Sequence, residues 1–121
     1  MTHSAHILLV DDDLQVVRFL KKALENEGYR VTATISGIDA LQAIATDRPD
    51  LLILDLNMPE PDGFDVLREE REKFPYLRTI VISGYLEGAL LEAAKIFGAV
   101  ATLQKPVTPQ ALLAQVHAIL G

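Results

Sequence analysis

The chain has 121 residues, of which 50% are apolar and 23% are charged, and this balance excludes a disordered chain and fits a globular domain. Its formal net charge is −6 and its 11 basic residues are scattered, which argues against a nucleic-acid surface of its own. The absence of cysteine excludes disulfides and thiolate sites. The apolar runs are too short to span a bilayer, and the amino terminus lacks the pattern of a secretory signal. We therefore expect one domain over residues 1–121, located in the cytoplasm.

Five short apolar runs alternate with five amphipathic segments of helical length, beginning with a run. This order predicts a strand followed by a helix, repeated five times. The predicted strands are residues 6–10, 29–34, 51–54, 79–82 and 99–103. The predicted helices are residues 14–27, 37–46, 64–73 and 86–97, followed by a last helix that Thr108 and Pro109 cap, with Gly28 and Gly98 ending the first and fourth helices.

The runs "LLIL" and "TIVI" place apolar residues on both faces of their strands, so both faces must be buried. A parallel sheet with helices packed on each face meets this requirement. The sequence therefore predicts a doubly wound α/β domain with a five-stranded parallel sheet. In such sheets, ligands bind at the carboxyl ends of the strands, where the strand order reverses.

Polar residues follow four of the five predicted strands. Asp11 and Asp12 close the first strand, Asp55 the third and Ser83 the fourth, while Lys105 lies just after the fifth. Because parallel strands end at one edge of the sheet, we expect these side chains to converge there. Three carboxylates in one crevice require a cation, and an oxygen-only ligand set without histidine or cysteine favours Mg²⁺.

The lysine and the serine add a further chemical possibility. An aspartate carboxylate can attack phosphorus and form an acyl phosphate when the phosphoryl oxygens are neutralised. Mg²⁺ and Lys105 can supply the positive charge, and the hydroxyl of Ser83 can donate a hydrogen bond. These residues thus indicate a phosphorylatable aspartate.

The segments "ILLVDDD", "LLILDLNMPEPDGFDVL", "TIVISGY" and "LQKPV" resemble, in order and spacing, those of response-regulator receiver domains of two-component signalling. The resemblance covers the whole chain and implies a flavodoxin-like (βα)₅ fold with strand order 2-1-3-4-5. It also implies a role for each site residue. Asp55 resembles the phosphoacceptor, and Asp11 and Asp12 resemble the acidic pair that binds the metal, with the main-chain carbonyl of Asn57 completing the metal shell. Ser83 resembles the hydroxyl that turns toward the phosphoryl group, and Lys105 resembles the cation that binds it. Pro106 is expected to follow a cis peptide bond.

The resemblance implies a signalling switch and not an enzyme with turnover. Such a domain accepts a phosphoryl group on Asp55 from a histidine kinase or a histidine phosphotransfer protein, with Mg²⁺, and slowly hydrolyses its own acyl phosphate. A conformational shift then controls an output domain or partner on the face formed by the last two helices and the fifth strand. Thr102 stands where receivers often carry an aromatic residue. We therefore expect a smaller rearrangement on that face, with Tyr85 and the loop from Gly84 to Gly88 taking up most of the change.

Two other functions use similar residues. A phosphatase of the haloacid-dehalogenase type also has an aspartate nucleophile, but it carries a second aspartate two residues later, where this chain has Asn57. A receiver-like interaction module that is never phosphorylated is the other possibility, and the complete set of site residues argues against it.

Simpler structural roles fit several other polar residues. Asp13 fits a cap of the first helix, Met58 fits loop packing, and the charged run over residues 68–73 fits a solvated helix face. The three histidines have no partners at metal-ligand spacing, so we expect them to be structural or exposed; they are His3, His6 and His117.

Overall fold

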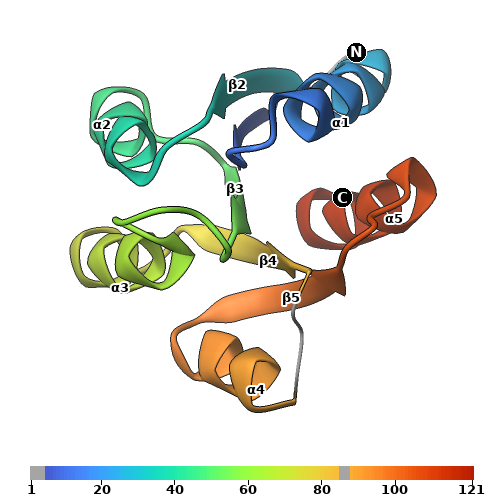
Figure 1. The fold of residues 1–121 in the computed structure, drawn as a ribbon. Helices are drawn as coiled ribbons and strands as arrows, with labels where there is room; N and C mark the ends of the chain where they lie inside the picture. The colour runs from blue at the N-terminus through green and yellow to red at the C-terminus, as the bar shows by residue number, and fades with distance from the viewer. Residues whose placement is uncertain (1–4, 85–87) are drawn as a thin grey trace.

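The computed structural model describes residues 5–84 and 88–121, in which five strands alternate with five helices (Figure 1). The strands are β1 (His6–Val10), β2 (Arg30–Thr34), β3 (Leu51–Asp55), β4 (Arg78–Ser83) and β5 (Ala99–Gln104). The helices are α1 (Leu14–Asn26), α2 (Gly37–Thr46), α3 (Gly63–Lys73), α4 (Gly88–Ile96) and α5 (Pro109–Leu120). The predicted elements are all present, with ends that differ by a residue or so; the predicted helical residues 86 and 87 lie outside the described part of the chain.

All strand pairs are parallel, and the strand order is β2-β1-β3-β4-β5, which confirms the predicted topology. The register aligns Val10 with Leu54, Asp55 with Ile82, and Ser83 with Gln104. The carboxyl ends of β1, β3, β4 and β5 therefore meet at one edge of the sheet.

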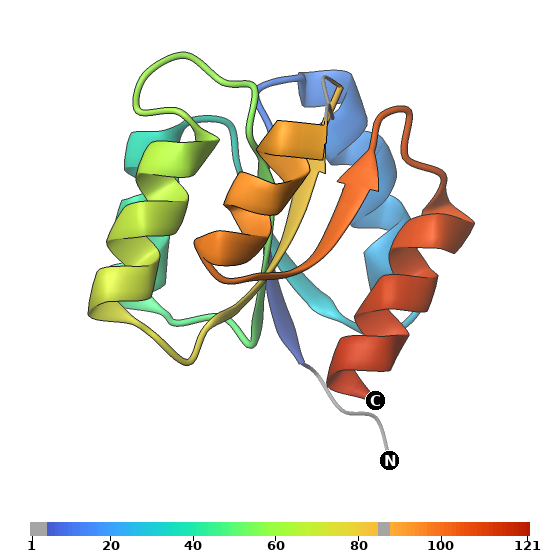
Figure 2. The ribbon, with the colours of Figure 1, turned by 90° about the horizontal axis from the view of Figure 1, so that it is seen from below.

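Helices cover both faces of the sheet (Figures 1 and 2). Alternate residues of the same strands enter two separate hydrophobic clusters, which explains why the central strands carry apolar residues on both faces. One cluster joins Leu8, Leu52, Leu54 and Val81 to α2, α3 and α4 through Ala40, Ile44, Val66, Leu67 and Ala94. The other joins Ile7, Leu9, Ile53, Ile80 and Ile82 to α1 and α5 through Val17, Leu20, Leu24, Leu112 and Val116.

Side-chain caps begin α1 and α3, the helices that follow β1 and β3. Asp13 accepts hydrogen bonds from the backbone N–H groups of Gln15 and Val16, which confirms it as the cap of α1. Asp62 and Asp65 form a reciprocal capping box at the start of α3. These caps hold the amino ends of α1 and α3 close to the carboxyl edge of the sheet.

The predicted solvated face over residues 68–73 is wrong at Glu70, which is 2% exposed. Glu70 lies one helical turn after the buried Val66 and Leu67, so it shares their face of α3. Its Oε1 accepts a hydrogen bond of 3.0 Å from the Thr79 hydroxyl, whereas Oε2 is buried with no hydrogen-bond partner among the described residues. Burial raises the pKa of Glu70 to about 7, against the smaller lowering effects of Thr79 and Arg71.

Three other structural expectations fall on described residues and are confirmed. Met58 is buried against the α2–α3–α4 side of the core. His6 is buried at the start of β1, where its Nε2 lies 2.7 Å from the Thr32 hydroxyl, and His117 is exposed on α5. His3 lies outside the described residues. Within residues 5–84 and 88–121, no helix has both the length and the apolar character that crossing a bilayer requires.

Candidate functional site

The sheet brings together the polar residues that the sequence singles out. Asp11 directly follows β1, Asp55 and Ser83 end β3 and β4, and Lys105 directly follows β5. Asp11 and Asp55 are 1% exposed and Ser83 is fully buried, although each adjoins a strand of the apolar core. The predicted convergence at the carboxyl edge is therefore present in the structure.

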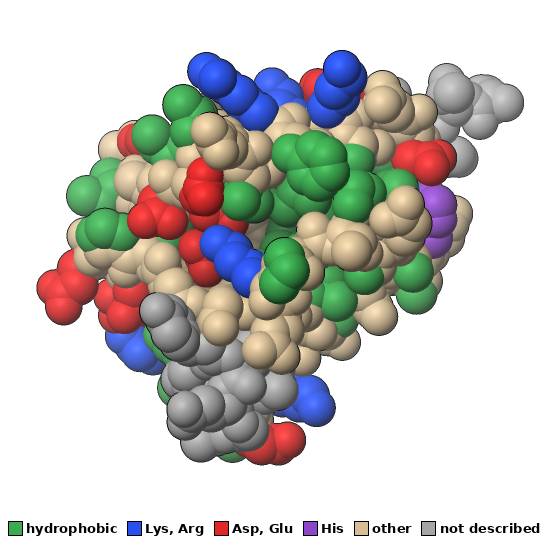
Figure 3. Space-filling view, turned by 45° about the vertical axis from the view of Figure 1, so that its right-hand side comes forward, with side chains coloured by type: hydrophobic (Ala, Val, Ile, Leu, Met, Phe, Trp, Pro, Cys, Tyr) green, Lys and Arg blue, Asp and Glu red, His purple; other side chains and the backbone are tan. Residues whose placement is uncertain are grey.

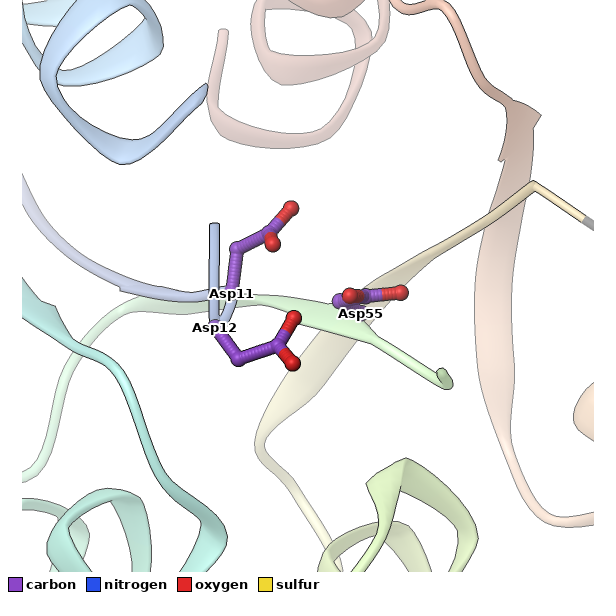
Figure 4. Close-up of side chains that lie close together, drawn as sticks. All are labelled: Asp11, Asp12 and Asp55. Atoms are coloured by element: carbon purple, nitrogen blue, oxygen red, sulfur yellow. The ribbon is translucent and has the colours of Figure 1, made fainter. Parts of the chain in front are cut away.

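Three carboxylates form an acidic cluster at this edge: Asp11, Asp12 and Asp55 each place one oxygen within 4.8 Å of the others (Figure 4). Asp12 is the exposed member of the cluster, and the other two are buried. Such close negative charges repel one another unless a cation is present.

Lys105 supplies one positive charge to this cluster. Its Nζ lies 2.9 Å from Asp11 Oδ2 and 3.3 Å from Asp55 Oδ2, so it bridges the two buried carboxylates. Partial burial acts to lower the pKa of Lys105, but the hydrogen bonds and charges of Asp11 and Asp55 together raise it above the usual value. Lys105 therefore stays protonated, and it balances one of the three carboxylate charges.

The environment of Asp55 sets its protonation. Burial is the largest influence and raises the pKa of Asp55, and the negative charge of Asp11 raises it further. The N–H of Asn57 and the ammonium group of Lys105 lower the pKa. Together these effects give Asp55 a pKa of about 6. The Asn57 N–H donates to Asp55 Oδ1 at 3.0 Å, and Lys105 Nζ donates to Oδ2. At pH 7 Asp55 is mostly ionised, which is the state a nucleophile needs.

The donor set of the cluster fits a hard divalent cation. All candidate ligands are oxygens, two of the three carboxylates are buried, and the exposed Asp12 leaves the cluster open to solvent on one side. Asp11 Oδ2 is buried, and Lys105 is its only ion-pair partner among the described residues. Mg²⁺ suits such a site because it binds through a few carboxylates and retains several waters.

The side chain of Asn57 has a contact that sequence reasoning missed. Its Oδ1 accepts a hydrogen bond of 2.5 Å from the Ser83 hydroxyl and one of 3.2 Å from the backbone N–H of Gly84. The sequence predicted a role only for the main-chain carbonyl of Asn57. No sequence signal points to this contact, because the path of the loop between β3 and α3 decides where the amide lies.

Gly63 permits the tight connection from β3 to α3. A Cβ atom at this position would lie 2.4 Å from the main-chain oxygen of Asp55 and 2.4 Å from the Cα of Leu56. The first residue of α3 thus packs directly on the backbone at the end of β3, and only glycine leaves room for this approach. The glycine of "PDG" therefore helps to hold Asp55 in place.

An apolar groove of about 450 Å³ lies beside Lys105, between α1 and the segment that follows β5. Phe19 of α1 is 59% exposed at this groove. Figure 3 shows hydrophobic side chains gathered next to a cleft with acidic and basic side chains. The other lining residues are Val16, Leu20, Ile82, Pro106 and Val107. No sequence signal points to this surface, since the spacing of Phe19 also fits a core position.

Two further expectations concern the switch. The peptide bond between Lys105 and Pro106 is cis, as the resemblance implied. Thr102 lies in β5 opposite Val81, and it is half-buried. Tyr85 lies outside the described residues, as do the next two positions of its loop.

Comparisons with known proteins agree on one family. The family "Response regulator receiver domain" matches residues 7–117. Response regulator MprA of Mycobacterium ulcerans is 38% identical over 117 residues, which are 97% of this chain and 50% of that protein. A putative response regulator from Chloroflexus aurantiacus is 32% identical, with a TM-score of 0.90 over 98% of each chain. A receiver domain described as "BeF3 Activated DrrB Receiver Domain" is 25% identical, with a TM-score of 0.89 over 98% of each chain. The chain spans about half the length of the curated relatives it matches.

Proposed function

This chain belongs to the response-regulator receiver family, and from that premise we propose that it accepts a phosphoryl group on Asp55 from a phosphohistidine of a partner protein. The geometry around Asp55 carries this proposal. Its buried carboxylate ends β3 within 3.3 Å of Lys105 and belongs to an acidic cluster that suits a divalent cation. The positive charge of Lys105, which lowers the pKa of Asp55, can also neutralise part of the negative charge of an incoming phosphoryl group.

The transfer step is a substitution at phosphorus. An Asp55 oxygen forms a bond to phosphorus, the bond from phosphorus to the donor histidine nitrogen breaks, and the leaving imidazole keeps that electron pair. Lys105 is already within 3.3 Å of Asp55 and can balance negative charge on the transferred group. The hydroxyl of Ser83 can donate a hydrogen bond to it after leaving Asn57.

We propose that Mg²⁺ is held by Asp11, Asp12 and Asp55 with the main-chain carbonyl of Asn57. When bound, Mg²⁺ supplies positive charge that stabilises the phosphoryl oxygens. The residues of the chain orient the acceptor, and the burial of Asp55 and Ser83 limits the approach of water. Slow attack by water on the acyl phosphate then releases phosphate and regenerates the Asp55 carboxylate, so the domain acts as a self-resetting switch.

The phosphatase alternative lacks a necessary group. The position two residues after Asp55 holds Asn57, whose amide accepts hydrogen bonds from Ser83 and Gly84. An amide cannot give a proton to a leaving group as a carboxylic acid does. This favours transfer from one partner over turnover of many phosphate esters.

Two surfaces suit the two partners of a switch. The apolar groove next to Lys105 lies beside the acceptor, so we propose that the phosphohistidine donor, a histidine kinase or phosphotransfer protein, docks there. We propose that the output partner or domain binds the face of α4, β5 and α5. Ile96 and Val100 support this second surface, because they are 73% and 52% exposed on α4 and β5.

The test is the addition of a phosphoryl group to the intact chain. Incubation with Mg²⁺ and acetyl phosphate should increase the mass by one phosphoryl group, and hydroxylamine should remove it because acyl phosphates are labile to this reagent. Asp55→Asn should abolish the addition, while Asp47→Asn, at the far end of α2, should retain it. Persistent addition to Asp55→Asn would move the acceptor elsewhere, and no addition to the wild type would favour an interaction module.

A further inference from the structure

The side chain of Asn57 has no part in the proposed phosphoryl transfer, yet it contacts the residue expected to move. Asn57 Oδ1 lies 2.5 Å from Ser83 Oγ and 3.2 Å from the backbone nitrogen of Gly84. The backbone N–H of the same residue donates to Asp55 Oδ1 at 3.0 Å. Asn57 therefore links the acceptor carboxylate to the end of β4.

The chemistry of the partners determines which end of the amide faces them. The Gly84 N–H can only donate, so the atom that meets it must be an acceptor, which is the amide oxygen. The Ser83 hydroxyl then donates its single proton to the same oxygen. Two hydrogen bonds at one oxygen hold both residues in a defined position.

This position competes with the phosphorylated state. Ser83 has one hydroxyl proton, and a proton donated to Asn57 is not available to a phosphoryl oxygen on Asp55. A hydrogen bond to a charged phosphoryl group is stronger than one to a neutral amide. Phosphorylation therefore supplies a reason for Ser83 to leave Asn57.

We propose that the side chain of Asn57 is a latch that stabilises the unphosphorylated conformation by holding Ser83 and Gly84, and that phosphorylation of Asp55 opens it. This inference rests on the proposed function of Asp55. The latch stabilises only one of the two conformations, so it sets how readily the switch turns on. Its removal shifts the population toward the activated state without any new contact to the phosphoryl group.

The first measurement is the affinity for beryllofluoride, a phosphoryl mimic, at saturating Mg²⁺ for each variant. Asn57→Ala should bind it about threefold to tenfold more tightly than the wild type, which corresponds to the loss of one typical hydrogen bond from the unactivated state. In the Ser83→Ala background, the same substitution should change the affinity much less, because the competing hydroxyl is absent. Equal affinities of Asn57→Ala and the wild type, or an equal gain in both backgrounds, would overturn the latch.

The second measurement needs no phosphoryl mimic. Hydrogen exchange of the Gly84 amide in the unphosphorylated protein should accelerate in Asn57→Ala, because this N–H loses its acceptor. Unchanged exchange at Gly84 would overturn the latch. If the wild type bound no beryllofluoride, the proposed function of Asp55 would fail, and the exchange of Gly84 alone would decide whether Asn57 holds the end of β4.

Discussion

Three carboxyl side chains are buried among the described residues, and different partner groups offset the unfavourable free energy of burying each carboxylate. Asp11 and Asp55 share the ammonium group of Lys105 at 2.9 and 3.3 Å. Within the described residues Glu70 has a hydrogen bond from the Thr79 hydroxyl and no ion pair, and burial raises its pKa to about 7. A buried charge without an ionic partner takes up a proton instead. Asp55 therefore stays mostly ionised at pH 7 beside Lys105, whereas Glu70 is close to half protonated there.

The raised pKa of Glu70 predicts a pH-dependent stability. Its pKa is about 7 in the folded protein and about 4.5 in the unfolded chain, so between these values the folded state binds more protons. This contribution to the free energy of unfolding is therefore largest at low pH, falls as the pH rises from about 4.5 to about 7, and then levels off. The difference is on the order of 3 kcal/mol, from about 1.4 kcal/mol for each pKa unit.

Glu70→Gln should remove most of this pH dependence and raise the free energy of unfolding at pH 8 by about 1–2 kcal/mol, because the new buried amide N–H₂ offsets part of the gain. Urea unfolding at several pH values measures both effects. Glu72→Gln is the matched control, since Glu72 is exposed on the same helix. Equal pH profiles of Glu70→Gln and the wild type would contradict the assigned pKa.

Asp12 provides a second prediction at the residue scale. Asp12→Asn should lower the affinity for Mg²⁺ at least tenfold, because one ligand charge is lost, and should raise the melting temperature of the metal-free protein by a few degrees, because repulsion from Asp11 and Asp55 is relieved. Calorimetric titration and thermal unfolding measure the two effects. Glu25→Gln makes the same change in net charge on the exposed side of α1, so it should leave the Mg²⁺ affinity unchanged.

At the scale of elements, sequence patterns predicted the strands and helices because each pattern has a local physical cause. The apolar runs at residues 51–54 and 79–82 became β3 and β4 because both of their faces are buried. Asp13 begins α1 through its own hydrogen bonds, and Gly28 follows α1 with a φ of +95°, where a side chain is strained. The site followed from the same logic, because polar residues at strand ends must meet once the sheet is parallel.

Features that depend on packing between elements were not predictable in this way. Glu70 belongs to a charged run, and only the orientation of α3 on the sheet decides that it is buried. The contact of the Asn57 amide with Ser83 depends on the path of a loop. The exposure of Phe19 at the apolar groove depends on how α1 lies beside the segment after β5. Helical spacing alone does not distinguish such positions from the core.

Gly63 leads to a prediction about the junction of β3 and α3. Gly63→Ala should lower the free energy of unfolding by about 1–3 kcal/mol and weaken Mg²⁺ binding, because a Cβ atom 2.4 Å from the oxygen of Asp55 must displace α3 or the end of β3. Gly28→Ala is the matched control. It is strained by its φ alone, with no atom within 4 Å of the added Cβ, so it should lower stability without changing the affinity for Mg²⁺. Unchanged Mg²⁺ affinity in Gly63→Ala would show that this close approach does not position Asp55.

At the scale of the whole molecule, one edge of the sheet holds the acceptor, and the strands connect it to surfaces farther away. β4 carries Ser83 at the site, and it pairs along its length with β5. The backbone N–H of Lys105 donates to the main-chain oxygen of Ser83 at 2.9 Å, so these two switch residues are also joined directly. A change at the site can thus reach β5, whose exposed Val100 lies on the proposed output face.

The size of that change depends on which contacts of β5 differ between the unphosphorylated and the phosphorylated conformation. Thr102 is half-buried in β5 opposite Val81, and it has no large ring that could exchange a buried position for an exposed one. A ligand shifts a population only through contacts that differ between the states. We therefore expect beryllofluoride with Mg²⁺ to change amide chemical shifts strongly at Ser83, Gly84 and Lys105, with changes that decline along β5 toward Ala99.

Asp55→Asn should show none of these changes, because the mimic requires the acceptor carboxylate. A large and uniform change along the whole of β5 in the wild type would contradict this expectation, since it would require a rearrangement of the strand that Thr102 cannot drive.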